Sequence, residues 1–346
     1  MILSAADLCT TFQERAAWTQ RHIRRSKMHR LALLEETITE INLAMIADKH
    51  EEHVFTRQFS RKEEGSKSGA DWLWCIGGPG AWLCMLVQAK LVSPKTGSCS
   101  NLDYRTGEQR ATLVKFARTH RFLPIYCIYS DIYEGFDPLA RKRSEFSQVD
   151  QRQWSCSLLT PKQVKALARK NQRSQEQLLA DAVPWMYPFC YAARETVQPL
   201  ARGLAAGLAH ARREMTFLSR VPAVPDSVWI SESPQQIEPR TPIEPKTRVP
   251  SEEPARAGKP RIHWEDPDPE ALVTEKLPSV VLRYLMESRA TSVPISGITV
   301  ISTVPVAPVI LDMAALPAPQ MDELRGLLSQ PFPLDAQVLP RDAGRR

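Results

Sequence analysis

An acid, an amide and a lysine lie on two neighbouring runs of strand-like sequence. Asp71 opens the first run, residues 71–76, and Gln88 and Lys90 end the second, residues 81–90. Side chains two residues apart share one face of a strand, so we expect Gln88 and Lys90 on the same side. Carboxylate and amide oxygens suit Mg²⁺, and a lysine beside such a metal can orient a water and help to deprotonate it. These residue types therefore indicate metal-assisted hydrolysis.

The sequence between the two runs predicts a β-hairpin. Residues 77–80 read Gly-Gly-Pro-Gly, which supplies the conformations of a tight turn. A turn centred on residues 78–79 pairs Asp71 near Leu86, within one or two residues of Gln88. The acid, the amide and the lysine then gather at the open end of the hairpin. The second arm is apolar on both faces, which is typical of a central strand.

The flanking sequence predicts the elements that position this hairpin. Apolar residues recur at offsets of 4, 3 and 4 in Leu34, Ile38, Ile41 and Met45, which favours a helix with one buried stripe. The expected order is helix, strand, strand, strand, helix, strand. It follows an N-terminal helix at 5–30 and consists of a helix at 31–48, strands at 54–59, 71–76 and 81–90, a helix at 108–120 and a strand at 123–130.

This arrangement resembles the PD-(D/E)XK nuclease superfamily. Gly-x-Asp at 69–71 followed by Gln-x-Lys at 88–90 is similar to its Mrr-type members, and the wider stretch of roughly residues 30–135 also looks like a bacterial domain family of unknown function. The resemblance implies an α/β protein with a restriction-endonuclease-like α-β-β-β-α-β core. It further implies a central mixed sheet, with additional helices on the C-terminal side.

The resemblance also implies roles for individual residues. Asp71 would bind Mg²⁺ or Mn²⁺, Gln88 would bind it through its amide oxygen, and Lys90 would position the attacking water. Glu36, or else Glu40, would complete the site from the preceding helix. The sequence departs from the pattern in having Ala70-Asp71 for Pro-Asp and an uncharged Gln88, so a further acid is needed, from Glu36, Glu40 or Glu64. Asp71 and Lys90 also suit an ordinary hairpin end, and the two glutamates suit a solvated helix face.

A second basic feature follows the core. Thr160-Pro161 is typical of a helix start, and we expect one helix to continue from there to about residue 182. Four cations recur along a strip of that helix and could contact phosphates, or could simply be a solvated face: Lys162, Lys165, Arg169 and Arg173. A further helix is expected from Ala192 to about Arg220, with Pro199 near a break or its start.

The composition divides the chain into two parts. Residues 1–215 hold 31 Lys+Arg against 22 Asp+Glu, whereas residues 216–346 hold 14 against 17 and 20 of the 28 prolines. We therefore expect a folded domain at 1–215 and a Pro-rich, largely disordered tail at 216–346 that is dispensable for folding. Within that tail, residues 270–289 could form a helix on binding a partner.

The cysteines and the apolar segments bear on location. All seven cysteines lie in the first part without Cys-x-x-Cys or zinc-site spacing, which favours free thiols in a reducing cytoplasm. Prolines and an acid interrupt the apolar stretch 298–316, so we expect no membrane span.

Two functions from different classes fit these observations. The first is a Mg²⁺- or Mn²⁺-dependent endonuclease that hydrolyses nucleic acid, DNA in the first instance. The second is a catalytically inactive module of the same fold that binds nucleic acid or a protein partner. The sequence leaves open a protein partner for the Pro-rich tail and a homodimer.

Overall fold

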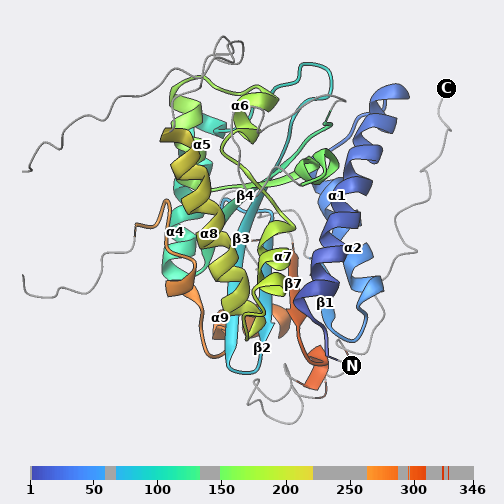
Figure 1. Ribbon diagram of the computed structural model, residues 1–346, viewed down its shortest axis with the longest axis vertical. Helices are drawn as coiled ribbons and strands as arrows, with labels where there is room; N and C mark the ends of the chain where they lie inside the picture. The colour runs from blue at the N-terminus through green and yellow to red at the C-terminus, as the bar shows by residue number, and fades with distance from the viewer. Residues whose placement is uncertain are drawn as a thin grey trace, which may run out of the picture.

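The protein is an α/β protein built on one seven-stranded mixed sheet (Figure 1). The computed structural model describes residues 2–58, 68–132, 149–220, 263–286, 295 and 297–308, together with residues 322 and 326. The strand order is β1-β7-β2-β3-β4-β5-β6. The strands are β1 (Val54–Gln58), β2 (Trp72–Gly78), β3 (Ala81–Leu91), β4 (Leu123–Tyr129), β5 (Cys156–Leu159), β6 (Val183–Pro184) and β7 (Gly297–Ser302).

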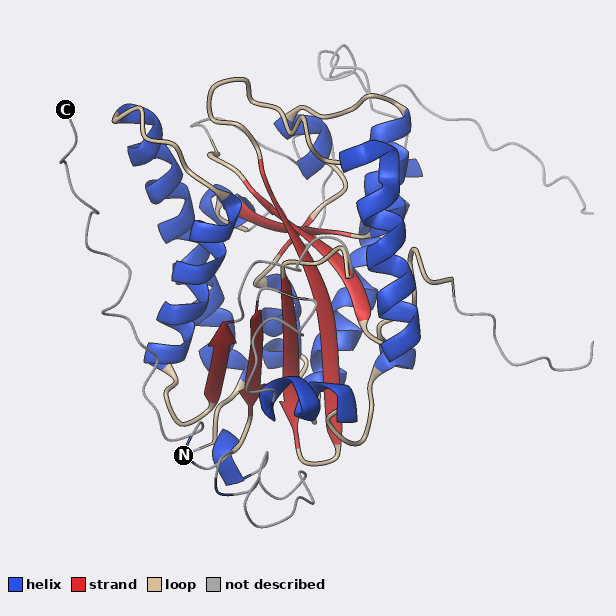
Figure 2. Ribbon diagram, turned by 180° about the vertical axis from the view of Figure 1, so that it is seen from behind, coloured by secondary structure: helices blue, strands red, loops and turns tan. Residues whose placement is uncertain are grey.

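The central hairpin forms as the sequence predicts. β2 and β3 pair in antiparallel fashion, with Trp72 opposite Val87 and Gly78 opposite Ala81. Every residue of β2 and β3 is buried except Leu91, the last residue of β3, because helices cover both faces of the sheet. β4 then runs parallel to β3, with Gln88 beside Tyr126. Figure 2 shows these long central strands from behind.

One face of the sheet is covered by α1 (Ala5–Met28), α7 (Tyr187–Arg194) and α8 (Leu200–Arg220). Its centre is aromatic: the Phe12 ring lies edge-on to Trp74 and Trp185 and stacks on Phe189. Trp185 also donates a hydrogen bond to the Phe12 carbonyl at 2.8 Å. The break expected near Pro199 is confirmed: α7 ends at Arg194 and α8 begins at Leu200, so only the start at Ala192 is wrong.

The opposite face is covered by α4 (Glu108–His120) and α9 (Ser279–Met286) (Figures 1 and 2). Beyond β5, the chain forms α5 (Pro161–Arg169) and α6 (Gln175–Leu179). A single helix to residue 182 was therefore the wrong prediction. α5 ends at Arg169, and Ser174 starts the second helix with its own capping box.

α2 (Glu35–Lys49) buries a different face from the predicted stripe. Leu34 and Met45 are exposed, whereas Thr39 and Asn42 are buried with Ile38 and Ile46. The physical reason is a polar network: Asn42 accepts a hydrogen bond from Arg15 and donates one to Thr19 of α1. Thr39 and Tyr129 of β4 also bond through their hydroxyls.

The domain boundary at residue 215 is wrong, because part of the predicted tail belongs to the sheet. β7 lies between β1 and β2, antiparallel to the first and parallel to the second. The Trp72 indole lies against Gly297, where an added Cβ would meet the ring at 2.1 Å, and donates to Thr299 at 2.9 Å. The proposed bound helix at 270–289 corresponds to a short 3₁₀ turn, Glu270–Leu272, and α9. The described part of the predicted tail consists of residues 216–220, 263–286, 295, 297–308, 322 and 326, and the rest of it lies outside the described ranges.

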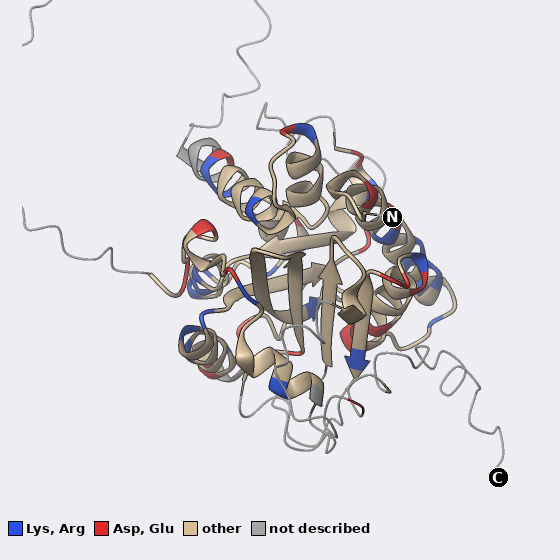
Figure 3. Ribbon diagram, turned by 90° about the horizontal axis from the view of Figure 1, so that it is seen from below, with Lys and Arg blue, Asp and Glu red and all other residues tan. Residues whose placement is uncertain are grey.

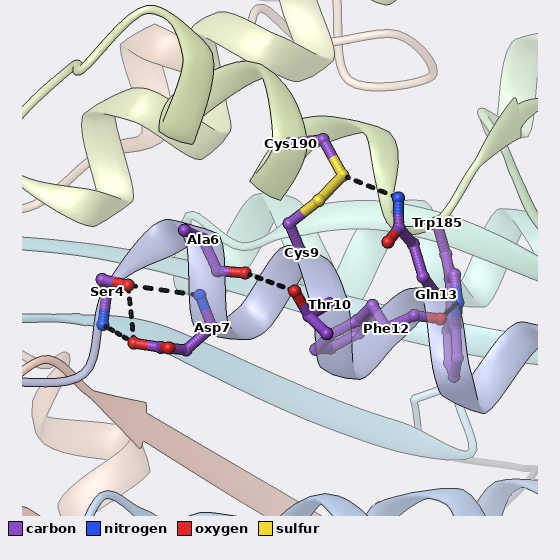
Figure 4. Close-up of a disulfide and its surroundings, with 9 residues drawn as sticks. All are labelled: Ser4, Ala6, Asp7, Cys9, Thr10, Phe12, Gln13, Trp185 and Cys190. Atoms are coloured by element: carbon purple, nitrogen blue, oxygen red, sulfur yellow. Dashed lines mark hydrogen bonds between the residues drawn. A yellow bond between two sulfur atoms is a disulfide. The ribbon is translucent and has the colours of Figure 1, made fainter. Parts of the chain in front are cut away.

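A disulfide joins α1 to α7. Cys9 of α1 is bonded to Cys190 of α7 (Figure 4). The expectation that every cysteine is a free thiol is therefore wrong for this pair, because the packing of α1 on α7 brings together residues that are 181 positions apart. The other five cysteines are free and buried, as expected of small apolar side chains. Among the helices in the described ranges, none is long and apolar enough to cross a membrane.

Candidate active site

Asp71, Gln88 and Ala89 form the centre of the site at the open end of the hairpin. The Asp71 Oδ2 atom accepts a hydrogen bond from Gln88 Nε2 at 2.5 Å and from the Ala89 amide at 2.7 Å. The Asp71 amide in turn donates to the Val87 carbonyl at 2.9 Å, next to the Trp72–Val87 pair. The prediction that Asp71 and Gln88 meet is confirmed by these contacts.

The glycine two residues before Asp71 is required by its backbone. Gly69 has φ of +68°, and a Cβ there would lie 2.4 Å from the Gln109 carbonyl oxygen and 2.7 Å from the Leu113 amide nitrogen. A side chain at residue 69 would therefore clash with the first turns of α4. This close approach brings the hairpin end and α4 together, which explains the Gly-x-Asp sequence in local terms.

Lys90 is buried at the same edge and contacts α4. Its side chain lies on the face that carries Gln88, and only 4% of the residue is exposed. Its Nζ donates to Gln109 Oε1 at 3.2 Å. A buried ammonium requires such partners, since removing a charge from water is costly. Lys90 thus belongs to the predicted cluster, with Gln109 as its direct neighbour.

Burial raises the pKa of Asp71 to about 7, despite the nearby Lys90 ammonium and the Ala89 amide, which favour the ionised carboxylate. The charges of Glu35 and Glu36, at the start of α2, raise the pKa further. A carboxyl group with a pKa near 7 can exchange a proton or accept a cation under neutral conditions. The environment of Asp71 is therefore unlike that of a surface aspartate.

Glu35 is the acid that the sequence reasoning missed. Its charge acts on Asp71 more strongly than that of Glu36, and it also raises the pKa of Cys99. Glu36 is half-buried in the same first turn of α2, so both glutamates lie on the side of the site. The structure starts this helix at residue 35, four residues later than predicted.

Glu40 lies against a different part of the sheet. It accepts a hydrogen bond from Gln58 of β1 at 2.7 Å. Gln58 pairs with Gly297 of β7, which pairs with Trp72 of β2. The contact between Glu40 and Gln58 on β1 is therefore two strand spacings, about 10 Å, from β2, the strand that follows Asp71. Glu64, a further acid considered for this site, lies outside the described residues.

The oxygens of Asp71 and Gln88 suit a hard divalent cation, but they supply only one carboxylate. Gln88 Oε1 is buried and accepts no hydrogen bond from any residue in the described ranges, so this oxygen is available to a ligand. Mg²⁺ commonly binds to one or two carboxylates and takes its remaining ligands from water or phosphate. However, no group of three or more His, Cys, Asp or Glu suited to a metal occurs in the part of the chain that is described. Asp71 and Gln88, with Glu35 and Glu36 close by, are the residues that would hold the ion.

The predicted basic strip is only partly formed. Lys162, Lys165 and Arg169 belong to α5, but the helix ends at Arg169. Arg173 instead turns to the loop before α4, where its Nη1 donates to the Ser100 carbonyl at 2.7 Å. Arg173 was therefore wrongly placed on the strip. Burial raises the pKa of Cys99, and the charges of Lys90 and Arg173 oppose this rise.

The fold and the site define an α/β protein with a buried carboxylate–amide–ammonium cluster at the edge of its central hairpin. The chain belongs to a family of unknown function, DUF6615, whose model matches residues 8–307. That range includes α9 and β7, in agreement with their place in the fold. The chain matches no curated protein and no solved structure.

Proposed function

We propose that the protein is a metal-dependent phosphodiesterase of the PD-(D/E)XK type that cleaves nucleic acid, DNA in the first instance. The observation that carries this proposal is the convergence of Asp71, Gln88 and Lys90 at one edge of a buried hairpin. The observed order α2, β1, β2, β3, α4, β4 supports it, with β7 as an insertion between β1 and β2.

Each group has a role that follows from its surroundings. Asp71 and Gln88 would hold Mg²⁺ or Mn²⁺, which supplies charge neutralisation at the phosphate when it is bound. Lys90 would hold the attacking water through its Nζ and stabilise the hydroxide that forms when the water loses its proton. Gln109 orients that ammonium, because its Oε1 accepts from Nζ at 3.2 Å.

The proposal is tested by metal-dependent cleavage. We expect the purified full-length chain to cleave labelled DNA in the presence of Mg²⁺ or Mn²⁺ and to lose this activity with EDTA. Asp71→Asn should remove both cleavage and metal binding, because it removes the carboxylate of the site. Cleavage that persists in the Asp71→Asn variant would come from a contaminant or another site and would overturn the proposal.

A catalytically inactive module of the same fold is the second candidate. It is favoured by the uncharged Gln88 at a position where a carboxylate would bind metal more strongly. Such a module would bind DNA, RNA or a protein without cutting. It is distinguished by a chain that binds nucleic acid in EDTA and shows no cleavage with either metal.

A further inference from the structure

Cations from three helices surround one short acidic segment of the same chain. The acidic segment, residues 264–268, precedes the 3₁₀ turn Glu270–Leu272 and contains Glu265, Asp266 and Asp268. The residues around it come from α4, α5 and α8 and are here called the cation cluster: Arg110, Lys162, Lys165, Arg169 and Arg212. In Figure 3, the charged residues gather on the helices around the sheet, while the strands carry few.

Glu265 is the most strongly held acid of the segment. Both of its carboxylate oxygens accept from Lys165 Nζ, at 2.7 and 2.8 Å, and Oε1 also accepts from Arg110 Nη1 at 3.1 Å. Burial by itself raises the pKa of Glu265, but Lys165, Arg110 and Arg169 outweigh this and leave the pKa below its usual value. The cation cluster therefore stabilises a negative charge at this position.

The second anchor of the segment is Arg212. Its Nη1 donates to the Pro267 carbonyl at 2.6 Å and lies 3.5 Å from Asp266, whose carboxylate is also 3.2 Å from Lys162 Nζ. The Nη2 atom of Arg212 is buried and has no hydrogen-bond partner in the described ranges. The acidic segment thus leaves one guanidinium donor unused, although guanidinium groups bind phosphates through two donors.

With the segment in place, the five cations face four acids, because Asp103, 3.2 Å from Arg110, also contacts the cation cluster within the described ranges. Removing the three acids of the segment would leave five cations facing this one carboxylate. Lys162 and the two acids that it and Lys165 contact are at least 30% exposed, and ion pairs of such exposure contribute little to stability. Another anion could therefore replace these contacts at low cost.

The cation cluster begins beside the candidate active site. Arg110 follows Gln109, the residue that bonds Lys90. The charges of both Arg110 and Asp71 act on Tyr126, which is the neighbour of Gln88 in the sheet. A strand of nucleic acid that lies on the cation cluster would therefore reach the hairpin edge.

We propose that the cation cluster binds the phosphate backbone of a nucleic acid and that the acidic segment competes with it within the same chain. This inference rests on the proposed function and adds a form of self-inhibition to it. Phosphate oxygens bind Lys and Arg as carboxylates do, and such contacts hold the backbone without reading sequence. The carboxylates of Glu265 and Asp266 occupy positions that phosphates take when the segment is displaced.

Charge-neutral variants of the segment test this competition. Binding of the full-length chain to a labelled duplex of about 20 base pairs is measured by fluorescence anisotropy in EDTA, so that cleavage does not interfere. We expect the double variant Glu265→Gln/Asp266→Asn to bind at least ~10-fold more tightly than the wild type, with a steeper dependence on salt. The control Glu270→Gln/Glu275→Gln makes the same change of net charge at exposed residues nearby and should change the affinity less than about twofold.

Two further measurements keep the inference open to refutation. Adding Lys165→Ala and Arg169→Ala to the charge-neutral variant should cancel its gain. If that variant does not unfold cooperatively, the single change Arg169→Ala is made in the wild-type chain. Arg169 is exposed, and its loss should lower the DNA affinity of that chain. No gain in the charge-neutral variant, an equal gain in the control, or an unchanged affinity in Arg169→Ala would each overturn the inference.

The outcomes also separate this inference from the proposed function. A gain in affinity without cleavage under any metal would support the cation cluster and reject the phosphodiesterase. Cleavage with Mg²⁺ without any gain in affinity would reject the self-inhibition and leave the phosphodiesterase in place.

Discussion

The ammonium of Lys90 donates a hydrogen bond to the side-chain oxygen of Gln109 and makes none to Asp71. The lysine and the acid thus lie in one buried cluster but have different partners, since Asp71 accepts from Gln88 and Ala89. Lys90 is thus held by α4, and Asp71 by its own hairpin. This separation of roles is the basis for the first prediction.

Lys90→Ala should reduce Mg²⁺-dependent cleavage by roughly 10²–10⁴-fold, the range typical of a group that assists proton transfer. DNA affinity in EDTA should change little if, as we propose, the phosphate contacts come from the cation cluster. Lys95→Ala removes the same charge at an exposed position a few residues away and serves as the control. A Lys90→Ala variant that cleaves at the wild-type rate would show that this ammonium has no role in the reaction.

The raised pKa of Asp71 predicts how stability depends on pH in the absence of metal. The unfolded chain loses the Asp71 proton near pH 4 and the folded protein near pH 7, so the folded state binds more protons between these values. Asp71 therefore lowers the free energy of unfolding as the pH rises from about 4 to about 7. The Asp71→Asn variant does not titrate and should lack this loss.

At pH 8 we expect Asp71→Asn to be more stable than the wild type by on the order of 2 kcal/mol, since one pKa unit corresponds to about 1.4 kcal/mol and solvent screening reduces the full effect. At pH 5 or below, the difference should be much smaller. Urea unfolding in EDTA at both pH values measures this, with Asp48→Asn, an exposed acid of α2, as control. Equal stability differences at the two pH values would contradict the raised pKa.

The central hairpin and the meeting of Asp71 with Gln88 were predictable because they depend on local sequence. A glycine-rich turn and two apolar runs determine the register, and the register then places residues 71 and 88 side by side. The position of β7 was not predictable in this way. Gly297 pairs with Trp72 across 225 residues of chain, and the apolar stretch 298–316 gave no local sign of its partner strands.

Two further errors have the same cause. Leu34 and Met45 fit a helical stripe, but tertiary contacts with α1 favoured the face with Asn42. The disulfide between Cys9 and Cys190 likewise depends on how two distant helices pack. Periodicity and composition describe neither of these contacts, because both depend on the three-dimensional arrangement of the helices.

The place of β7 in the sheet predicts a large effect of a single glycine. Gly297→Val should lower the free energy of unfolding by about 1–3 kcal/mol or more, because its side chain would overlap the Trp72 ring. Gly326→Ala is the control, since an added Cβ there meets no atom within 4 Å. Thermal unfolding of both variants gives the comparison, and an unaffected Gly297→Val variant would argue against the packing of Trp72 on β7.

Truncation examines the same strand at a larger scale. A chain that ends at residue 220 lacks β7 and α9 and should lose cooperative unfolding, since β1 and β2 then have no strand between them. A chain that ends at residue 308 keeps both elements and is the matched control. Equal melting of the two truncated chains would mean that the C-terminal strand is dispensable.

The last prediction concerns which glutamate completes the site. Glu35 acts on Asp71 more strongly than Glu36 does, and Glu40 contacts Gln58 of β1. We therefore expect Glu35→Gln to weaken Mn²⁺ binding the most, Glu36→Gln less, and Glu40→Gln hardly at all, as measured by calorimetric titration. Because the charge of Glu35 raises the pKa of Asp71, Glu35→Gln should also move the loss of stability at rising pH to lower pH values.

These two readouts separate binding of the metal from electrostatics alone. If Glu35→Gln shifts the pH dependence but leaves Mn²⁺ affinity unchanged, Glu35 influences Asp71 without contacting the ion, and Glu36 becomes the candidate ligand. If Glu40→Gln has the largest effect on affinity, α2 must move relative to β1 when metal binds, because the Gln58 contact holds Glu40 two strands away from β2. If Glu35→Gln both weakens Mn²⁺ binding and shifts the pH dependence, Glu35 is the acid that compensates for the uncharged Gln88.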